Sequence, residues 1–223
     1  MKALRLMLCL GAVVGRLCAP AQGTFQNLDF EQAIDVPTYP GSPLILTANA
    51  FPGWTVYAGG VPLTEVAHDG VIAGPVALAD LAAPYLVLDG RFSAVLGGIG
   101  LVAFPVSIAQ SGTVPAGSES LRFLESGGLL VSFAGHPLPL ELLGNGPNAS
   151  YVYGANISAY AGQYGQLTFE TSPSLNGGYN ILDDITFSAQ PITEPGVLPV
   201  LSLGALILSP RRRRRRARAA TIR

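Results

Sequence analysis

Short apolar runs, each bounded by glycine, proline, asparagine or aspartate, recur along the chain between residues 24 and 190. The runs are rich in Val, Ile, Leu, Phe and Tyr, and none has the spacing of an amphipathic helix. We therefore expect strands at Phe25–Phe30, Leu44–Thr47, Trp54–Tyr57, Tyr85–Leu88, Val102–Ala109, Leu121–Leu124, Leu129–Phe133, Tyr151–Ile157, Gln166–Phe169 and Ile181–Phe187.

Alternation within these runs indicates which face of each strand is buried. In the run Val102–Ala109, Val102, Phe104, Val106 and Ile108 share one face. Ten or more strands without helices to form parallel crossovers predict an all-β, antiparallel β-sandwich. A jelly roll is the first expectation, and a more open Greek-key sandwich is the alternative. The stretch 58–83, rich in small residues, is expected to be the longest irregular segment.

The first 21 residues have the pattern of a signal peptide. Lys2 and Arg5 precede the apolar stretch Leu6–Val14, and Ala19-Pro20-Ala21 resembles a cleavage site. An apolar run this short does not span a bilayer. We expect an N-terminal signal helix at residues 1–21 that directs the chain to the Sec export machinery. The alternative is a buried N-terminal helix.

The C-terminal segment 191–223 has a different pattern. Thr193-Glu194-Pro195 is followed by an uncharged stretch at 196–208, and then by Arg211, Arg212, Arg213, Arg214, Arg215, Arg216 and Arg218. A helix of this length covers about 20 Å, less than the ~30 Å of a hydrocarbon core. The arginines are expected to stay cytoplasmic, which leaves the preceding domain outside.

This order of features resembles the PEP-CTERM sorting signal of Gram-negative bacteria, with Thr193 in place of the first proline. The resemblance implies cleavage near residues 193–195 by an exosortase-like protease, after the tail has tethered the precursor to the inner membrane. It also implies release to the cell surface or the extracellular matrix. The competing interpretation of the arginine run is a nuclear-localisation or nucleic-acid patch.

The charges are segregated along the chain. Residues 22–190 contain 13 carboxylates and only two basic residues, Arg91 and Arg122, and so have a formal charge of −11. Such a domain repels phosphate backbones, so we expect no nucleic-acid partner for it. Both cysteines, Cys9 and Cys18, lie in the leader, so the mature chain would have no disulfide.

The strands expected at the two ends of the domain carry a second resemblance. Gln26–Glu31, Pro52-Gly53-Trp54 and Ile181–Ile185 are similar to landmarks of jelly-roll carbohydrate-binding and galactose-binding-like modules. The resemblance implies binding of extracellular polysaccharide and, in some of these families, a structural calcium ion where the first and last strands meet.

Glu31, Asp183 and Asp184 are the candidate calcium ligands, because calcium prefers carboxylate and carbonyl oxygens. Alternation places Asp183 on one face with Ile181, Ile185 and Phe187, which would carry its carboxylate inward. A buried carboxylate needs a partner. The alternatives to calcium are backbone amides or solvent.

Aromatic residues are the candidate glycan contacts: Trp54, Tyr151 and Tyr153. Each has a second interpretation, since Trp54 after Pro-Gly is typical of a core residue and the two tyrosines could pack on a buried face. His68 is expected in a turn and His136 in a loop, and neither accompanies a known catalytic motif. The sequence thus predicts a non-enzymatic surface or matrix protein with a structural or adhesive role. The alternatives are a carbohydrate-binding module and, third, a secreted hydrolase.

Overall fold

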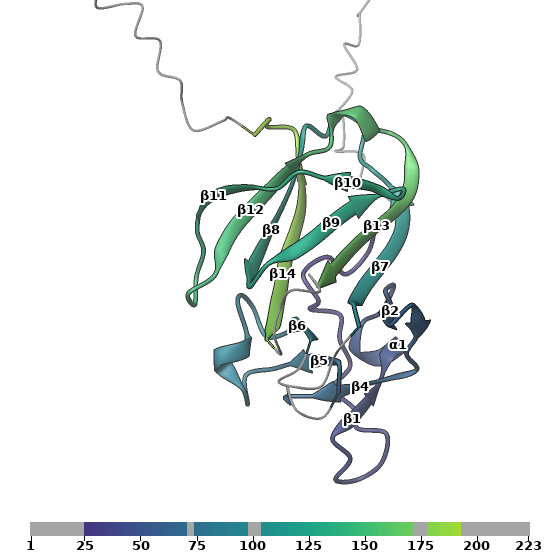
Figure 1. Cartoon of the computed structure of the whole chain (residues 1–223). Coiled ribbons are helices and arrows are strands. Elements are labelled where there is room, and N and C mark those ends of the chain that lie inside the picture. Colours follow the sequence, from purple (N-terminus) through teal and green to yellow (C-terminus); the bar gives the residue numbers. More distant parts are fainter. Residues whose placement is uncertain (1–24, 71–73, 98–103, 172–177, 193–223) are drawn as a thin grey trace, which may run out of the picture. The chain divides into compact units, whose positions relative to one another are not determined.

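The computed structural model describes residues 25–70, 74–97, 104–171 and 178–192, which belong to one compact unit ending at Ile192. Two β-sheets make up most of this unit (Figure 1). The expected signal helix, the Thr193-Glu194-Pro195 motif, the apolar segment 196–208 and the arginines at 211–218 lie outside the described residues. Among the described residues, no helix is long and apolar enough to cross a membrane.

The larger sheet has eight strands in the order β1-β4-β5-β6-β14-β8-β12-β11. Its strands are β1 (Leu44–Leu46), β4 (Glu65–His68), β5 (Val76–Ala79), β6 (Ser93–Gly97), β8 (Ser120–Ser126), β11 (Glu141–Asn145), β12 (Tyr151–Asn156) and β14 (Tyr179–Ser188). Neighbours in this sheet are antiparallel except β4 and β5, which pair in parallel.

The smaller sheet has six strands, all paired antiparallel, in the order β10-β9-β13-β7-β2-β3. Its strands are β2 (Thr55–Ala58), β3 (Val61–Pro62), β7 (Val106–Thr113), β9 (Leu129–Phe133), β10 (His136–Leu138) and β13 (Tyr164–Thr171). The helical elements are short: α1 (Thr47–Ala50) and 3-10 turns at Pro84–Leu86 and Ser158–Tyr160.

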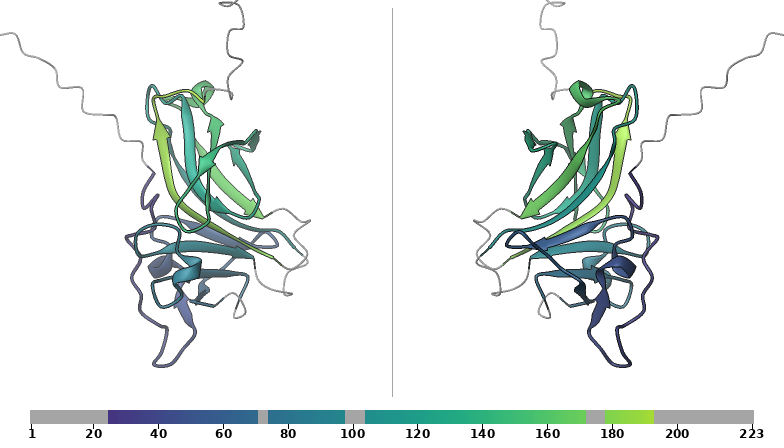
Figure 2. Two further views of the ribbon diagram at one scale, coloured as in Figure 1. Left: turned by 90° about the vertical axis from the view of Figure 1, so that its left-hand side faces the viewer. Right: turned by 90° about the vertical axis from the view of Figure 1, so that its right-hand side faces the viewer.

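The strand order confirms the predicted jelly roll. From β6 onward the chain crosses from one sheet to the other after each strand, except at the hairpins β9–β10 and β11–β12. This gives one half-sandwich β6-β14-β8-β12 and a second half β7-β13-β9-β10. Two Greek keys interleaved in this way define a jelly roll. Figure 2 shows the long strands β7, β8, β12, β13 and β14 running side by side in the two curved layers.

Two clusters of buried apolar side chains stabilise the sandwich. The main core lies between the two sheets and contains Trp54, Phe123, Phe133 and Phe169. A second cluster includes Ala67, Ala77 and Val95 of the larger sheet together with Leu86 and Leu88 of the segment that follows β5. Because two clusters are present, β5 is buried along its whole length.

Three sequence expectations about strands are wrong. Phe25–Phe30 is a loop rather than a strand, since Asn27 and Phe30 adopt left-handed φ angles of 49° and 57° that break an extended chain. Tyr85–Leu88 overlaps a 3-10 turn that begins at Pro84, where the ring of proline fixes φ for a helical first position.

The third wrong expectation is the irregular stretch 58–83, which contains β3, β4 and β5. Its strands have two to four residues, and two of the four residues of β5 are alanines. Each contains a single β-branched residue, Val61, Val66 or Val76, and no aromatic residue, so the sequence signal for a strand is weak. The other eight expected strands are confirmed, with ends that differ by a few residues and with residues 102–103 outside the described part.

Candidate functional site

A continuous series of aromatic ring contacts runs from the core to the surface. Phe51 contacts Phe30, Phe30 contacts Trp54, Trp54 contacts Phe169, Phe169 contacts Phe123, and Phe123 stacks on Tyr153. Tyr153 in turn meets Tyr151 edge to face, with ring centroids 6.4 Å apart. We call this series the aromatic ladder; it consists of Phe30, Phe51, Trp54, Phe123, Tyr151, Tyr153 and Phe169.

Tyr151 forms the exposed end of the aromatic ladder. Its side chain is 43% exposed, whereas Tyr153 is half-buried and packs against the main core. On β12, Tyr151 lies opposite Glu125 of β8 on one side and Asn145 of β11 on the other. Residues opposite each other in antiparallel strands share a face, so an exposed ring, a carboxylate and an exposed amide come together here.

Glu125 is a fully buried carboxylate within this group. Its Oε1 accepts a hydrogen bond of 2.8 Å from the Leu129 amide, while its Oε2 has no hydrogen-bond partner. Burial raises the pKa of Glu125 to about 7, and this amide only partly opposes the increase. Burial, followed by the charge of Glu125, also raises the pKa of Tyr153.

Trp54 is not available to a sugar, so its predicted glycan contact is wrong. Its side chain is 5% exposed and lies in the middle of the aromatic ladder. The indole Nε1 donates a hydrogen bond of 2.9 Å to the backbone oxygen of Asn27, so even its polar atom is used internally. The core interpretation of Trp54 is therefore confirmed.

Backbone amides satisfy the carboxylates of Glu31 and Asp183. Oε1 of Glu31 accepts hydrogen bonds from the amides of Arg91 at 2.7 Å and Phe92 at 3.0 Å. Asp183 is 1% exposed. Its Oδ2 accepts from Ser93 Oγ at 2.5 Å and from the Asp89 amide at 3.2 Å, while its Oδ1 accepts from the Asp184 amide at 2.8 Å. Burial still raises the pKa of Asp183 to about 7.

A β-bulge at Asp183 and Asp184 corrects the expected facing of this strand. Between the pairs Asp183↔Leu124 and Thr186↔Arg122, β14 has one residue more than β8, and Asp184 has a φ of 43°. An extra residue reverses the alternation. Ile181 therefore belongs to the second cluster, and Ile185 packs in the main core.

The expected calcium site is not assembled. Glu31, Asp183 and Asp184 do not form a set of converging ligand atoms among the described residues, where such a set occurs only around His68. Asp184 instead lies near Asp29 and Asp89, and burial followed by these two like charges raises the pKa of Asp184.

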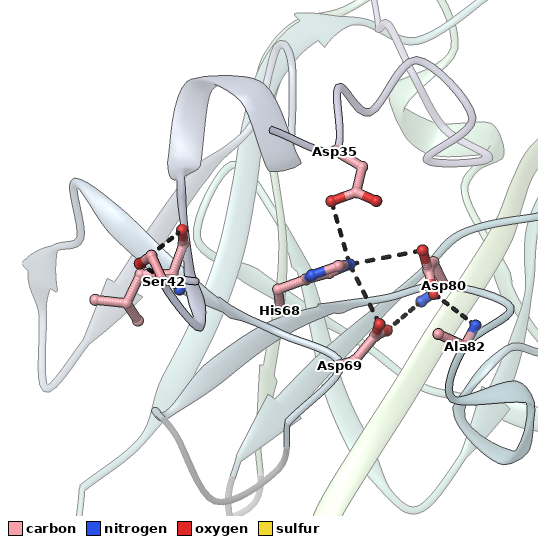
Figure 3. A network of polar contacts seen from close by, with 7 residues as sticks. Asp35, Ser42, His68, Asp69, Asp80 and Ala82 are labelled. Atoms are coloured by element: carbon pink, nitrogen blue, oxygen red, sulfur yellow. Dashed lines mark hydrogen bonds and ion pairs between the residues drawn. The ribbon is translucent and has the colours of Figure 1, made fainter. Parts of the chain in front are cut away.

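A second polar cluster surrounds the imidazole of His68 (Figure 3). The Nε2 atom lies 3.2 Å from Asp35 Oδ1, 3.3 Å from Asp69 Oδ2 and 3.6 Å from Asp80 Oδ2. We call these four residues the His68 cluster. Its side chains are between 13% and 23% exposed.

The topology explains how the His68 cluster forms. β4 and β5 are parallel, with His68 opposite Leu78, so the residues that follow them, Asp69 and Asp80, emerge at the same edge. The Asp69 amide donates to Leu78 O, and the Asp80 amide donates to Asp69 Oδ1 at 2.7 Å. Asp35 arrives from the loop before β1, at the centre of a tight turn in which the Val36 amide donates to Ile34 O.

The carboxylates of this cluster differ in their proton affinity. Burial raises the pKa of Asp69, and the amide of Asp80 and the charge of His68 oppose this increase only in part. Burial acts in the same direction on Asp80, but there the Ala82 amide at 2.6 Å, followed by Asp69 and His68, outweighs it and lowers the pKa.

Two grooves lie elsewhere on the surface. One, of about 650 Å³, is lined along β9, β10 and β13 by leucines, prolines and Glu170. It has no aromatic ring on which a sugar could stack. The other, of about 630 Å³, lies between the loop 25–32 and the end of β14 and is lined by Asp29, Gln32 and Asp184.

Sequence reasoning identified the tyrosines but not the other groups of these sites. The sequence places His68 in a turn, and nothing in the local pattern joins it to Asp35 and Asp80, which lie 33 and 12 residues away. Glu125 was missed as well. Its position on the same face as Leu121 and Phe123 of an expected strand was the available signal.

No family model and no curated protein matches the chain. Among solved structures, the chain is similar to the carbohydrate-binding module TmCBM61 in complex with β-1,4-galactotriose. The identity is 14% and the TM-score is 0.43, over 74% of this chain and 96% of that one. The strand order described above, rather than this likeness, assigns the jelly-roll fold.

Proposed function

We propose that this domain is a non-catalytic glycan-binding module of an exported protein, and that Tyr151 and Tyr153 contact the sugar rings. The observation that carries the proposal is the aromatic ladder, which ends at the surface in the exposed ring of Tyr151. The exposed Asn145 beside it supplies an amide for hydroxyl groups.

Packing gives Tyr151 the properties of a binding platform. A sugar ring presents an apolar C–H face that can lie on an aromatic ring, while its hydroxyls need hydrogen-bonding groups. Tyr151 is held edge to face by Tyr153, which itself stacks on the buried Phe123. A ring fixed in this way loses little conformational freedom on binding, so more of the contact energy becomes affinity.

The charge of the domain favours neutral glycans. Residues 22–190 carry 13 carboxylates against two arginines, and Arg91 and Arg122 are already engaged with Phe92 and with Ser120. An anionic polysaccharide would be repelled by such a surface. A neutral polysaccharide meets no such penalty.

Glycan binding by the full chain and two variants tests this function. The probes are immobilised neutral oligosaccharides, including β-1,4-galactotriose, with an anionic uronate oligomer as the opposite case. We expect Tyr151→Ala to weaken binding at least tenfold, about 1.4 kcal/mol. Tyr85→Ala, which removes a tyrosine that is 69% exposed but outside the ladder, should leave binding unchanged. Equal losses in both variants, or no binding by the wild type, would contradict the proposal and favour a purely structural matrix role.

The two ends of the chain support the cellular part of the proposal. The leader at 1–21 would deliver the domain across the inner membrane, and the tail at 191–223 would hold it there until cleavage near Thr193-Glu194-Pro195. Expression in a Gram-negative host that has an exosortase should give a mature form shorter than the precursor at both ends. Glu194→Ala should accumulate the membrane-bound precursor, whereas Thr193→Pro should not.

A further inference from the structure

The His68 cluster contains more negative charge than its own residues can neutralise. Three carboxylates face one imidazole, so a charge of −2 remains even when His68 is protonated and all three carboxylates are ionised. The described residues contain two other strong cations, Arg91 and Arg122. Arg91 lies over the ring of Phe92, and Arg122 bonds to Ser120 and Pro191, so neither neutralises this cluster.

A proton does not satisfy the cluster either. The Nε2 atom of His68 and the Oδ1 atom of Asp35 are both inaccessible to solvent, lie 3.2 Å apart, and still have no hydrogen-bond partner. One N–H group can point at only one acceptor, whereas three carboxylate oxygens approach this nitrogen. These two atoms therefore face the same point without a hydrogen bond between them.

Distances between the converging atoms fit a metal ion at that point. Tetrahedral zinc with bonds of about 2.0 to 2.2 Å separates its ligand atoms by about 3.3 to 3.6 Å. The three N···O distances are 3.2, 3.3 and 3.6 Å. In addition, the ligand atoms of Asp35, His68 and Asp80 all lie within 4.8 Å of one another.

The donor types select the class of metal. Calcium takes six to eight oxygen ligands at longer distances, and an imidazole nitrogen is not among them. Imidazole combined with carboxylates suits zinc and its neighbours in the transition series. We propose that Asp35, His68 and Asp80 bind one zinc-class divalent cation, with the fourth position taken by water and with Asp69 beside the ligands as an outer-shell carboxylate.

The position of this site gives the ion a structural role. The parallel seam between β4 and β5 has only two paired positions, Ala67↔Ala77 and His68↔Leu78. The ion would join the ends of both strands to the loop that carries Asp35. It would thereby hold together the part of the larger sheet that lies beyond the jelly-roll strands.

Metal titration of the purified, chelator-treated full chain tests the proposal. Zn²⁺ should bind with a stoichiometry of one and raise the melting temperature by several degrees, and Co²⁺ should give the visible absorption of a tetrahedral site. His68→Ala should abolish both effects, and Asp69→Asn should weaken binding about 10- to 100-fold. His136→Ala, which removes the exposed histidine of β10, is the matched control and should behave as wild type.

Amide hydrogen exchange tests the proposal on the wild-type protein, so it does not require that a variant folds. Zn²⁺ should slow exchange of the amides of β4 and β5 in the wild type and leave those of β8 and β12 unchanged. Three results would overturn the proposal. They are no binding of Zn²⁺ by the wild type, Zn²⁺ binding that survives in His68→Ala, and a rise in melting temperature with Ca²⁺ that is the same in the wild type and in His68→Ala. None of these results depends on whether the domain binds glycans.

Discussion

Different interactions hold the candidate site residues in place at the two ends of the larger sheet. At the β12 end, Tyr151 and Tyr153 continue a series of rings that extends through the core to Phe51. At the β4–β5 end, His68 and three aspartates meet in a cluster with unpartnered atoms. One end is held by contacts within the chain, while the other presents charge that an added ion would balance.

This difference follows from where the two ends lie in the fold. β12 belongs to the eight strands of the jelly roll and faces the smaller sheet, so aromatic residues there can bury most of their surface. β4 and β5 extend the sheet beyond β6 and carry no aromatic ring in either cluster. They contribute Val66, Val76 and Leu78 to the main core and only alanines to the second cluster. Burial of large rings is worth several kilocalories per mole, and alanines offer much less. We therefore expect an ion, rather than ring packing, to fix the side chains at the β4–β5 end.

The largest expected effect comes from breaking the aromatic ladder at Phe123. Phe123→Ala removes a ring that is 1% exposed and that supports Tyr153 on one side and Phe169 on the other. We expect a loss of about 3 to 5 kcal/mol in unfolding free energy, measured by urea denaturation. Glycan affinity should fall as well, because Tyr151 loses its support, while Zn²⁺ binding should persist.

Leu78→Ala is the matched variant at the opposite end of the sheet. Leu78 is fully buried and lies opposite His68. Its truncation should also destabilise the domain, but it should weaken Zn²⁺ binding and spare glycan binding. If both variants impair both ligands equally, the two ends are not independent and the comparison fails.

The pH dependence of stability sharpens the contrast at the β12 end. The pKa of Glu125 is raised from 4.5 to about 7, so the folded state holds this proton more tightly than the unfolded state. Its contribution to stability is fully present below about pH 4.5 and is lost as the pH rises through about 7. The loss amounts to about 3 kcal/mol.

Glu125→Gln should remove this component from the pH profile. Gln keeps an oxygen for the Leu129 amide but cannot ionise, so the fall in stability between pH 5 and pH 8 should be about 2.5 kcal/mol smaller than in the wild type. Urea denaturation at both pH values measures it. An unchanged pH profile would mean that Glu125 is already ionised in the folded protein at pH 5.

Much of the fold could be predicted from local patterns, because long strands rich in β-branched and aromatic residues are recognisable in the sequence. β7, β8, β9, β12, β13 and β14 all do so, and their number implies a sandwich. The failures have local causes: left-handed turns at Asn27 and Phe30, a proline-initiated turn at Pro84, and the alanine-rich β5. The two turns replace the apolar pattern with backbone geometry. β5 is a short, uniformly buried apolar run without the alternation that marks a half-buried strand.

The candidate sites were less predictable because they depend on register and long-range pairing. The bulge at Asp184 places Asp183 on the opposite face of the strand from Ile185. The alternation of apolar and polar residues in the sequence does not indicate that one residue has been added. The His68 cluster requires the parallel pairing of β4 with β5 in a region that was expected to be irregular. The tyrosines were found because aromatic residues near glycine and asparagine are visible in the sequence itself.

The smallest expected effect concerns Trp54, in the middle of the aromatic ladder. Trp54→Phe keeps a ring against Phe30 and Phe169 but removes the buried hydrogen bond from Nε1 to Asn27 O. The cost should be about 1 to 2 kcal/mol, since a buried acceptor loses its donor. Glycan affinity and Zn²⁺ affinity should both stay within a factor of about two, because ring packing and the backbone of β2 are retained. Calorimetric melting and the same two binding assays measure these effects. A large loss of glycan affinity at unchanged stability would mean that Trp54 contacts the glycan. The aromatic ladder would then bind the ligand directly instead of supporting Tyr151.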